Sequence, residues 1–258
     1  MAAIVMFDDG SHRNVLLEDY SDGAAVQANQ HLIIDGRSGM ILDPGGHKVY
    51  SKVLAETLQR IGAGGRLDHV FLSHQDPDIV AAVNGWLMTT DAIAHVSKLW
   101  VRFVPHFGLD RLVIDRLKGI PDAGQWMRLG DTELAIVPAH FLHSAGNFQV
   151  YDPRSRILYT GDLGASVDVP YREVPDFDAH APNMLGFHQR YMASGSALRA
   201  WADMARGLDI EIIAPQHGAL FRGKEMVGKF IDWISTLEAG IDLLTKNGGY
   251  AMPPRSGT

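Results

Sequence analysis

The chain has 258 residues, of which 46% are hydrophobic and 21% charged, so it can bury a large core and is not a disordered chain. Its formal net charge of -7 argues against nucleic acid or an anionic membrane surface as the main partner. Because cysteine is absent, disulfides, thiolate zinc sites and cysteine nucleophiles are excluded, and any metal must be held by nitrogen and oxygen donors.

The sequence shows neither a membrane span nor a secretory signal. No apolar run approaches the roughly 18 residues that a transmembrane helix needs. The N-terminal stretch "MAAIVMFDDGSHRN" has no basic segment ahead of an apolar one. We therefore expect a cytoplasmic location, with no membrane as partner.

The first half of the chain predicts strands around one long helix. Residues 31–36 and 38–46 are apolar runs separated by Gly36–Gly39, which indicates a hairpin. Residues 48–65 have apolar positions at helical spacing and end in glycines, which is typical of a helix and its cap. Residues 67–74 predict a buried strand, and residues 92–100 predict a strand that runs into a helix.

The second half predicts a hairpin followed by alternating helices and strands. Residues 131–143 and 147–162 indicate strands, with a turn at Asp152-Pro153. A helix is expected over 196–208 and a strand over 209–218. One helix is expected over 224–244, with its apolar face formed by Met226, Val227, Phe230, Ile231, Ile234, Leu237 and Ile241. The whole is predicted to be a single domain over residues 1–245, with a loose C-terminal tail over 246–258.

The chemistry begins in the stretch "SHQDPD". His74, Asp76 and Asp78 follow a predicted strand directly, and two carboxylates so close together repel one another unless a cation lies between them. Pro77 disfavours helical backbone at Asp76 and restricts its own φ, so both carboxylates can be aimed. Two simpler interpretations stay open: Asp78 as the N-cap of the segment from Ile79, and Pro77 as an ordinary turn residue.

Four predicted strands end close to a residue that can bind a metal. These residues are His74, His143, Asp162 and His217. Side chains at the ends of neighbouring strands converge at one edge of a sheet, where α/β proteins place their sites. The remaining candidate histidines are interpreted as hydrogen-bonded structural residues: His69, His95, His140, His180 and His188.

With these residues in this order, the sequence resembles the metallo-β-lactamase superfamily and, within it, the diiron domain of flavodiiron proteins. The resemblance is carried by "SHQDPD", "LHS", "LYTGDLG" and "IAPQHGALFR", with 18 residues between His143 and Asp162, and it spans about residues 25 to 245. It implies an α/β fold, the αββα four-layer metallo-β-lactamase sandwich, with a dinuclear metal site at the sheet edge.

The resemblance also implies a role for each site residue. His74, Asp76 and His143 would hold a first metal, Asp78 and His217 a second, and Asp162 would bridge them. The implied cofactor is two iron ions, Fe2+ or Fe3+, with a bridging hydroxide or oxygen species, and zinc or manganese are the alternatives. Three carboxylates would leave two divalent ions with a net charge near +1, which suits an anionic ligand. No catalytic residue is assigned beyond this set.

Two positions depart from the flavodiiron pattern. Asp76 stands where the family has a glutamate, and Ile79 stands where many relatives carry a histidine ligand of the second metal. An alkyl side chain cannot coordinate, so the resemblance implies an open position for an exogenous ligand. Weaker metal affinity and degeneration of the site are the alternatives.

The resemblance leaves three functions open. The first is a non-haem diiron protein that binds dioxygen, as an oxygen sensor or signalling module, because no phosphate-binding loop of a flavodoxin domain follows. The second is a dinuclear metal-dependent hydrolase of the glyoxalase or lactonase type. The third is an oxygen or nitric oxide reductase. Whether the protein is an enzyme is left open.

The partners expected from these hypotheses are dioxygen or another small ligand, a signalling protein or a separate flavoprotein reductase, and a second copy in a homodimer. Some aromatic and polar residues could line the site, although packing over the sheet edge is the favoured interpretation for them: Trp86, Trp100, Tyr171, Tyr191 and His188.

Overall fold

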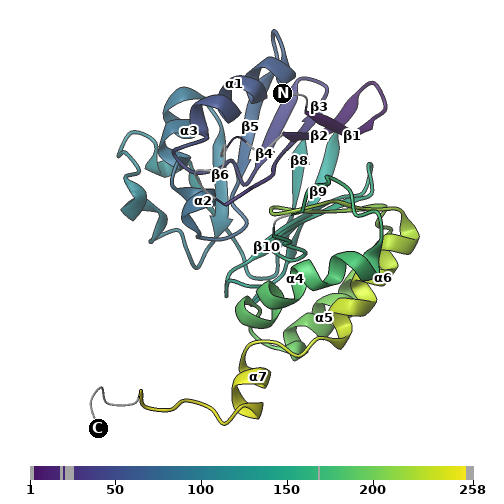
Figure 1. The fold of residues 1–258 in the computed structure, drawn as a ribbon. Helices are drawn as coiled ribbons and strands as arrows, with labels where there is room; N and C mark the ends of the chain where they lie inside the picture. The colour runs from purple at the N-terminus through teal and green to yellow at the C-terminus, as the bar shows by residue number, and fades with distance from the viewer. Residues whose placement is uncertain (1–2, 18–19, 21–25, 168, 254–258) are drawn as a thin grey trace.

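Two β-sheets stacked face to face form the centre of the molecule, and helices cover both outer faces (Figure 1). The computed structural model describes residues 3–17, 20, 26–167 and 169–253. Both chain halves contribute one sheet and its covering helices, so the layers follow the order αββα. The fold expected from the resemblance is confirmed.

The first sheet has seven strands whose spatial order follows the sequence. Its first pairs are antiparallel, and those from β4 onward are parallel. The strands are β1 (Ile4–Asp8), β2 (His12–Leu17), β3 (Gln30–Asp35), β4 (Ser38–Leu42), β5 (Arg66–Phe71), β6 (Ile93–Ser97) and β7 (Leu117–Ile120).

The second sheet has six strands in the order β13-β12-β11-β10-β9-β8. Only the β11–β12 pair is parallel. The strands are β8 (Gln125–Leu129), β9 (Thr132–Pro138), β10 (Phe148–Asp152), β11 (Ile157–Gly161), β12 (Ile212–Pro215) and β13 (Phe221–Arg222).

Helices pack on the outer face of each sheet. The first sheet carries α1 (Tyr50–Ile61), the short α2 (Pro77–Val80) and α3 (Val83–Thr89), with 3-10 turns at Val104–Phe107 and Ile114–Arg116. The second carries α4 (Phe177–Tyr191), α5 (Gly195–Ala205) and α6 (Lys224–Thr236), and α7 (Ile241–Lys246) follows (Figure 1).

Three apolar layers result from the alternation of side chains along the strands. In β3, Leu32 and Ile34 face the helices of the first sheet, whereas Ile33 between them faces the second sheet. All three are buried, and each such side chain contributes about 1.5–3 kcal/mol to folding. The layer between the sheets joins Ile33 and Met40 to Phe148. It therefore holds the two halves in register.

Two expectations about the helices are wrong, and one helix had not been predicted. The helix expected over 224–244 is two helices, because Gly240 lies at φ +52° with Ala193 so close that a β-carbon would collide, and Ile241 is half-exposed. Residues after β6 form turns and a 3-10 segment rather than an α-helix. Helix α4 was not expected, since Pro182 lies inside it.

The expected tail begins inside α7, which ends at Lys246. Residues 247–253 contain no helix or strand, and Tyr250 and Met252 are almost fully exposed. The rest of that segment, residues 254–258, lies outside the described residues. Whether residues 1–245 fold as one domain stays a prediction.

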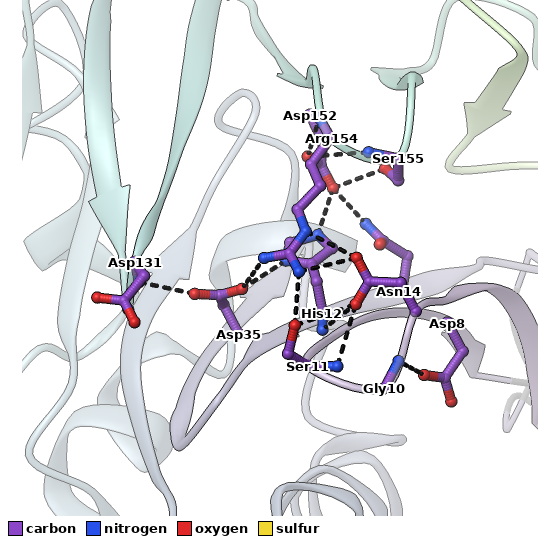
Figure 2. A network of polar contacts seen from close by, with 12 residues as sticks. Asp8, Gly10, Ser11, His12, Asn14, Asp35, Asp131, Asp152, Arg154 and Ser155 are labelled. Carbon is purple, nitrogen blue, oxygen red and sulfur yellow. Dashed lines mark hydrogen bonds and ion pairs between the residues drawn. The ribbon is translucent and has the colours of Figure 1, made fainter.

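A buried ionic network joins the two sheets at the ends of β10 and β11 that meet at the Asp152-Pro153 turn (Figure 2). The His12 ring is fully buried, with Nδ1 3.0 Å from Asp35 and Nε2 2.7 Å from Asp152. Asp152 also accepts from Asn14 and Ser155, and Arg154 donates to Asp35. Strand β2 is thereby tied to the turn between β10 and β11.

Protonation of His12 should stabilise the metal-free protein. Burial lowers the pKa of His12, but the bonds and charges of Asp152 and Asp35 outweigh it and raise the pKa above its usual 6.5. The contribution to stability is then complete below pH 6.5 and is lost as pH rises through the folded pKa. We expect His12→Gln to lower the unfolding free energy by about 3 kcal/mol below that pH, and by less above it.

Urea unfolding of the metal-free protein from about pH 6 to pH 10 would measure this difference. The matched control is His31→Gln, because burial lowers the pKa of His31 to about 3 and leaves the ring neutral throughout this range. The difference between wild type and His31→Gln should stay flat. A His12→Gln difference that is equally flat, or that grows with pH, would contradict the ionic role of His12.

Candidate metal centre

The six predicted site residues come together at one end of the sandwich, five of them in loops and Asp78 in the first turn of α2. His74 follows β5, Asp162 follows β11 directly and His217 follows β12, so three of the loops leave the carboxyl ends of strands. His143 lies in the loop between β9 and β10. Since β10 is antiparallel to β11, this loop reaches the same edge. The convergence expected from the strand ends is confirmed.

Four of the residues form a compact group around one position. His143 Nε2 lies 2.9 Å from Asp162 Oδ2 and 3.4 Å from Asp76 Oδ2, and His74 Nε2 lies 3.6 Å from Asp76 Oδ2. All four candidate ligand atoms lie within 4.8 Å of one another. Ligands at about 2.1 Å from one ion lie about 3–3.5 Å apart, so this spacing suits a single metal.

The remaining two residues form a second group that shares Asp162 with the first. His217 Nε2 lies 3.4 Å from Asp78 Oδ2 and 3.5 Å from Asp162 Oδ1. Asp162 therefore presents Oδ2 to the first group and Oδ1 to the second. A carboxylate with one oxygen in each of two groups can bridge two metals. The geometry agrees with the bridging role that the resemblance implied, although the role itself stays a prediction.

Hydrogen bonds aim the ring nitrogens of two histidines toward the centre. Ser73 Oγ lies 2.9 Å from His74 Nδ1, and the Gln27 carbonyl lies 2.5 Å from His217 Nδ1. Because a carbonyl only accepts, His217 carries a proton on Nδ1 and offers Nε2 to the site. Among the described residues, the buried His74 Nε2 and Asp162 Oδ1 have no hydrogen-bond partner. Unpaired, inward-facing donor atoms of these types fit a bound metal.

Two glutamines hold the outer carboxylates, and sequence reasoning missed both. Gln75 Nε2 donates to Asp76 Oδ1 at 3.0 Å, and Ser144 Oγ donates to Gln75 Oε1 at 2.6 Å. Gln216 Nε2 donates to Asp78 Oδ2 at 3.0 Å. Their only signal in the sequence is their place, since each directly adjoins a predicted ligand in "SHQDPD" or "APQHG".

The turn around Pro77 does not place Asp78 at the N-cap of a helix. Helix α2 starts at Pro77, and its N-cap is Asp76, so the interpretation of Asp78 as N-cap is wrong. Asp76 has extended backbone, as expected before proline, and its side chain makes no capping bond. Both carboxylates are therefore free of helix capping and available to the site.

Close packing fixes the loops that carry Asp162 and His217. Gly218 has φ +85°, and a β-carbon there would collide with Ser166, so only glycine fits after His217. The Gly164 amide donates to His188 Nε2 at 3.0 Å, while His188 Nδ1 donates to the Met184 carbonyl at 2.8 Å. His188 thus fixes the loop after Asp162 by hydrogen bonding and does not line the site.

The negative charge of the carboxylates favours protonated histidines at the place where a metal ion would bind. Burial lowers the pKa of His143, but bonds and charges from Asp162 and Asp76 outweigh it and raise the pKa to about 10. In the same way Asp78 and Asp162 overcome burial and raise the pKa of His217 to about 9. Burial raises the pKa of Asp162, yet the surrounding imidazoles lower it on balance. A dication would displace these protons and satisfy the same field.

Two aromatic rings of α4 cover His143. Phe187 and Tyr191 stack at 4.7 Å, with their centroids 6.3 Å and 5.7 Å from the His143 ring. Trp86 is fully buried in the apolar layer of the first sheet, which also contains Ile79. Tyr171 pairs with His180. Of the aromatic residues considered as site lining, Tyr191 alone contacts a predicted ligand among the described residues.

The five histidines that were interpreted as structural have hydrogen-bond partners, as expected. His69 and His95 bond each other at 3.1 Å, and His140 bonds the Asp122 carbonyl.

Among the residues that the structure describes, no helix combines the length and apolar character that crossing a lipid bilayer would need.

Comparisons with known proteins identify the family and similar structures. A family model described as ODP family beta lactamase matches residues 26–218. The "Peroxy diiron species of chemotaxis sensor ODP" is 39% identical with a TM-score of 0.84, and the match covers 95% of this chain and 99% of that one. The apo state of chemotaxis sensor ODP from T. denticola is 38% identical, with a TM-score of 0.85 and coverage of 95% and 98%.

A curated relative, diflavin flavoprotein A 1 of Synechocystis sp., is 25% identical over 225 residues. The match covers 81% of this chain but 35% of the relative, so the chain spans about a third of that protein's length.

Replacement of the shared carboxylate should remove both metals together. We expect Asp162→Asn to lower the affinity of both positions for ferrous iron, because it neutralises the one side chain that belongs to both groups. His217→Ala should weaken one position and leave the other. Saturation of the wild-type protein at 100 times the Kd should stabilise it by about 2.7 kcal/mol per ion. Anaerobic metal titration with thermal unfolding measures both effects. Loss of a single ion in Asp162→Asn would contradict the bridge.

Proposed function

The chain belongs to the ODP family of β-lactamases, and we propose that it is a non-haem diiron protein that binds dioxygen and acts as a sensor. The observation that carries this proposal is the shared placement of Asp162, with one oxygen in each of two adjoining groups of histidine and aspartate. That arrangement has room for two ions and requires a positive charge in both places.

The donor set fits iron, and a similar protein supports iron among the metals that it fits. Three imidazoles and three carboxylates are hard or borderline donors, which suit iron or manganese as well as zinc. A relative of 39% identity is described as a peroxy diiron species, and the match covers nearly the whole of both chains. His74, Asp76, His143 and Asp162 would hold one iron ion, and Asp78, His217 and Asp162 the other.

Bound ferrous ions supply the redox chemistry toward dioxygen that imidazole and carboxylate groups lack. The protein's own residues orient and shield the site. Ser73 and the Gln27 carbonyl fix two imidazole rings, and Gln75 holds Asp76. The stacked rings of Phe187 and Tyr191 cover His143 and limit the access of water to this side.

The sensing role needs a partner that responds to ligand binding. Support comes from two relatives described as chemotaxis sensor ODP, at 39% and 38% identity. We propose a signalling protein as this partner and retain a separate flavoprotein reductase as the alternative that a reductase function would require. A homodimer and a cytoplasmic location stay predictions.

Reversible dioxygen binding can be observed directly. The metal-free protein is loaded anaerobically with two equivalents of ferrous iron, then exposed to air while the visible spectrum is recorded. We expect a visible absorption band that persists for minutes or longer and decays when dioxygen is removed. His217→Ala, loaded in the same way, is the matched control and should not develop the band.

Two other results would point to the alternative functions. Rapid, continuous dioxygen or nitric oxide consumption once a flavoprotein and reductant are added, with no persistent band, would favour a reductase. Turnover of a lactone or thioester by the protein with two zinc ions, without a response of the iron form to air, would favour a hydrolase. Either result would overturn the sensor proposal.

A further inference from the structure

The two groups of the metal centre do not offer the same number of protein donors. Four residues surround the first position, whereas Asp78, His217 and the shared Asp162 are the predicted donors of the second. Ile79, next to Asp78, is fully buried among apolar side chains and provides no donor atom. Among the described residues, the second position is therefore one predicted donor short of the first.

The side chain of Gln216 lies beside this second position. It is 1% exposed, and its Nε2 lies 3.0 Å from Asp78 Oδ2, the same oxygen that approaches His217. Its Oε1 is buried and has no hydrogen-bond partner among the residues that the structure describes. An unpaired buried acceptor of this kind costs about 1–3 kcal/mol, so a ligand for it is expected.

The backbone of Gln216 holds the amide in place. Its N–H donates to the Gly161 carbonyl at 2.7 Å, next to Asp162, and its carbonyl accepts from Asn29 N at 2.6 Å. The Asn29 side chain also donates to the carbonyls of Pro215 and Gly218, on either side. The segment that bears Gln216 is thus held between the end of β11, which precedes Asp162, and Asn29, which directly precedes β3 of the other sheet.

Gln75, the corresponding residue at the first position, shows what is unusual about Gln216. Both ends of the Gln75 amide are satisfied, since Nε2 donates to Asp76 and Oε1 accepts from Ser144. Its oxygen cannot turn toward a metal without losing the Ser144 bond. The oxygen of Gln216 loses nothing by turning.

A half-turn of the terminal amide exchanges its oxygen and nitrogen at nearly the same positions. In the metal-free protein the nitrogen faces Asp78, because an unmetallated carboxylate needs a donor. We propose that Gln216 is a ligand of the second metal position through Oε1 when Asp78 binds the ion. This inference rests on the proposed two-metal site.

A neutral amide oxygen is a weaker donor than imidazole or carboxylate, and it adds no charge to the site. It would complete the protein's donors to the second ion and yet be displaced readily by a small ligand. The second position would then be the one that opens to dioxygen. Gln216 would in this way determine which of the two metal positions opens to dioxygen.

Three substitutions test the assignment. Gln216→Glu keeps an oxygen donor and loses the N–H, whereas Gln216→Met has a similar length and neither group. Gln75→Met is the matched control, since it removes an amide from the carboxylate of the other position. Each metal-free protein is titrated anaerobically with ferrous iron against a chromophoric chelator, and thermal unfolding of the metal-free form checks its fold.

For Gln216→Met we expect the second ion to bind at least about tenfold more weakly, with the first within about twofold. Gln216→Glu should bind two ions, the second as tightly as in wild type or more so. Gln75→Met should leave the second ion unchanged. The inference would be overturned if Gln216→Met bound the second ion as tightly as wild type does. It would also be overturned if both Gln216 variants lost the second ion equally, because the role would then belong to the N–H alone. If the wild-type protein binds fewer than two ions, both the inference about Gln216 and the proposed function are overturned.

Discussion

The structure of the site depends on one electrostatic constraint, the concentration of three carboxylates, with the buried Asp162 between Asp76 and Asp78. Oδ2 of Asp162 faces His143 and His74, and Oδ1 faces His217. The neighbouring carboxylates raise the pKa of His143 and that of His217 well above the usual value. Positive charge is thus required at two adjoining places, and it comes from protons in the metal-free protein. Two divalent ions would supply this positive charge with fixed geometry, so the shared carboxylate indicates two metal positions.

The sandwich satisfies this constraint by holding the strands rigidly at both ends. Strands β10 and β11 carry the metal centre at one end, where His143 precedes β10 and Asp162 follows β11. At the other end their connecting turn is tied to β2 and β3 through His12 and Asp35 (Figure 2). A strand fixed at its far end cannot slide within the sheet, so the donor atoms keep their spacing when the metals are absent. The site is therefore preformed in the metal-free protein.

Much of this arrangement could be predicted from the sequence, because its cause is local. Strands end where apolar runs end, and donors placed at those ends must converge, so the strands and the convergence of the six predicted site residues could be foreseen. The contacts across the site were not. Gln75 and Gln216 look alike in sequence. Only the fold shows that Ser144 donates to the amide oxygen of Gln75, whereas the amide oxygen of Gln216 has no hydrogen-bond partner among the described residues. Helix α4 escaped prediction because Pro182 interrupts its pattern, and the break before α7 follows from the contact of Gly240 with Ala193.

The most direct test of the account is to locate the metals in crystals grown anaerobically with ferrous iron. Anomalous scattering measured at the iron absorption edge should show two peaks per chain, one on each side of the Asp162 carboxylate, with His74 and His143 at one peak and His217 and Asp78 at the other. A single peak, or peaks that do not share Asp162, would contradict the central claim that this carboxylate joins two metal positions.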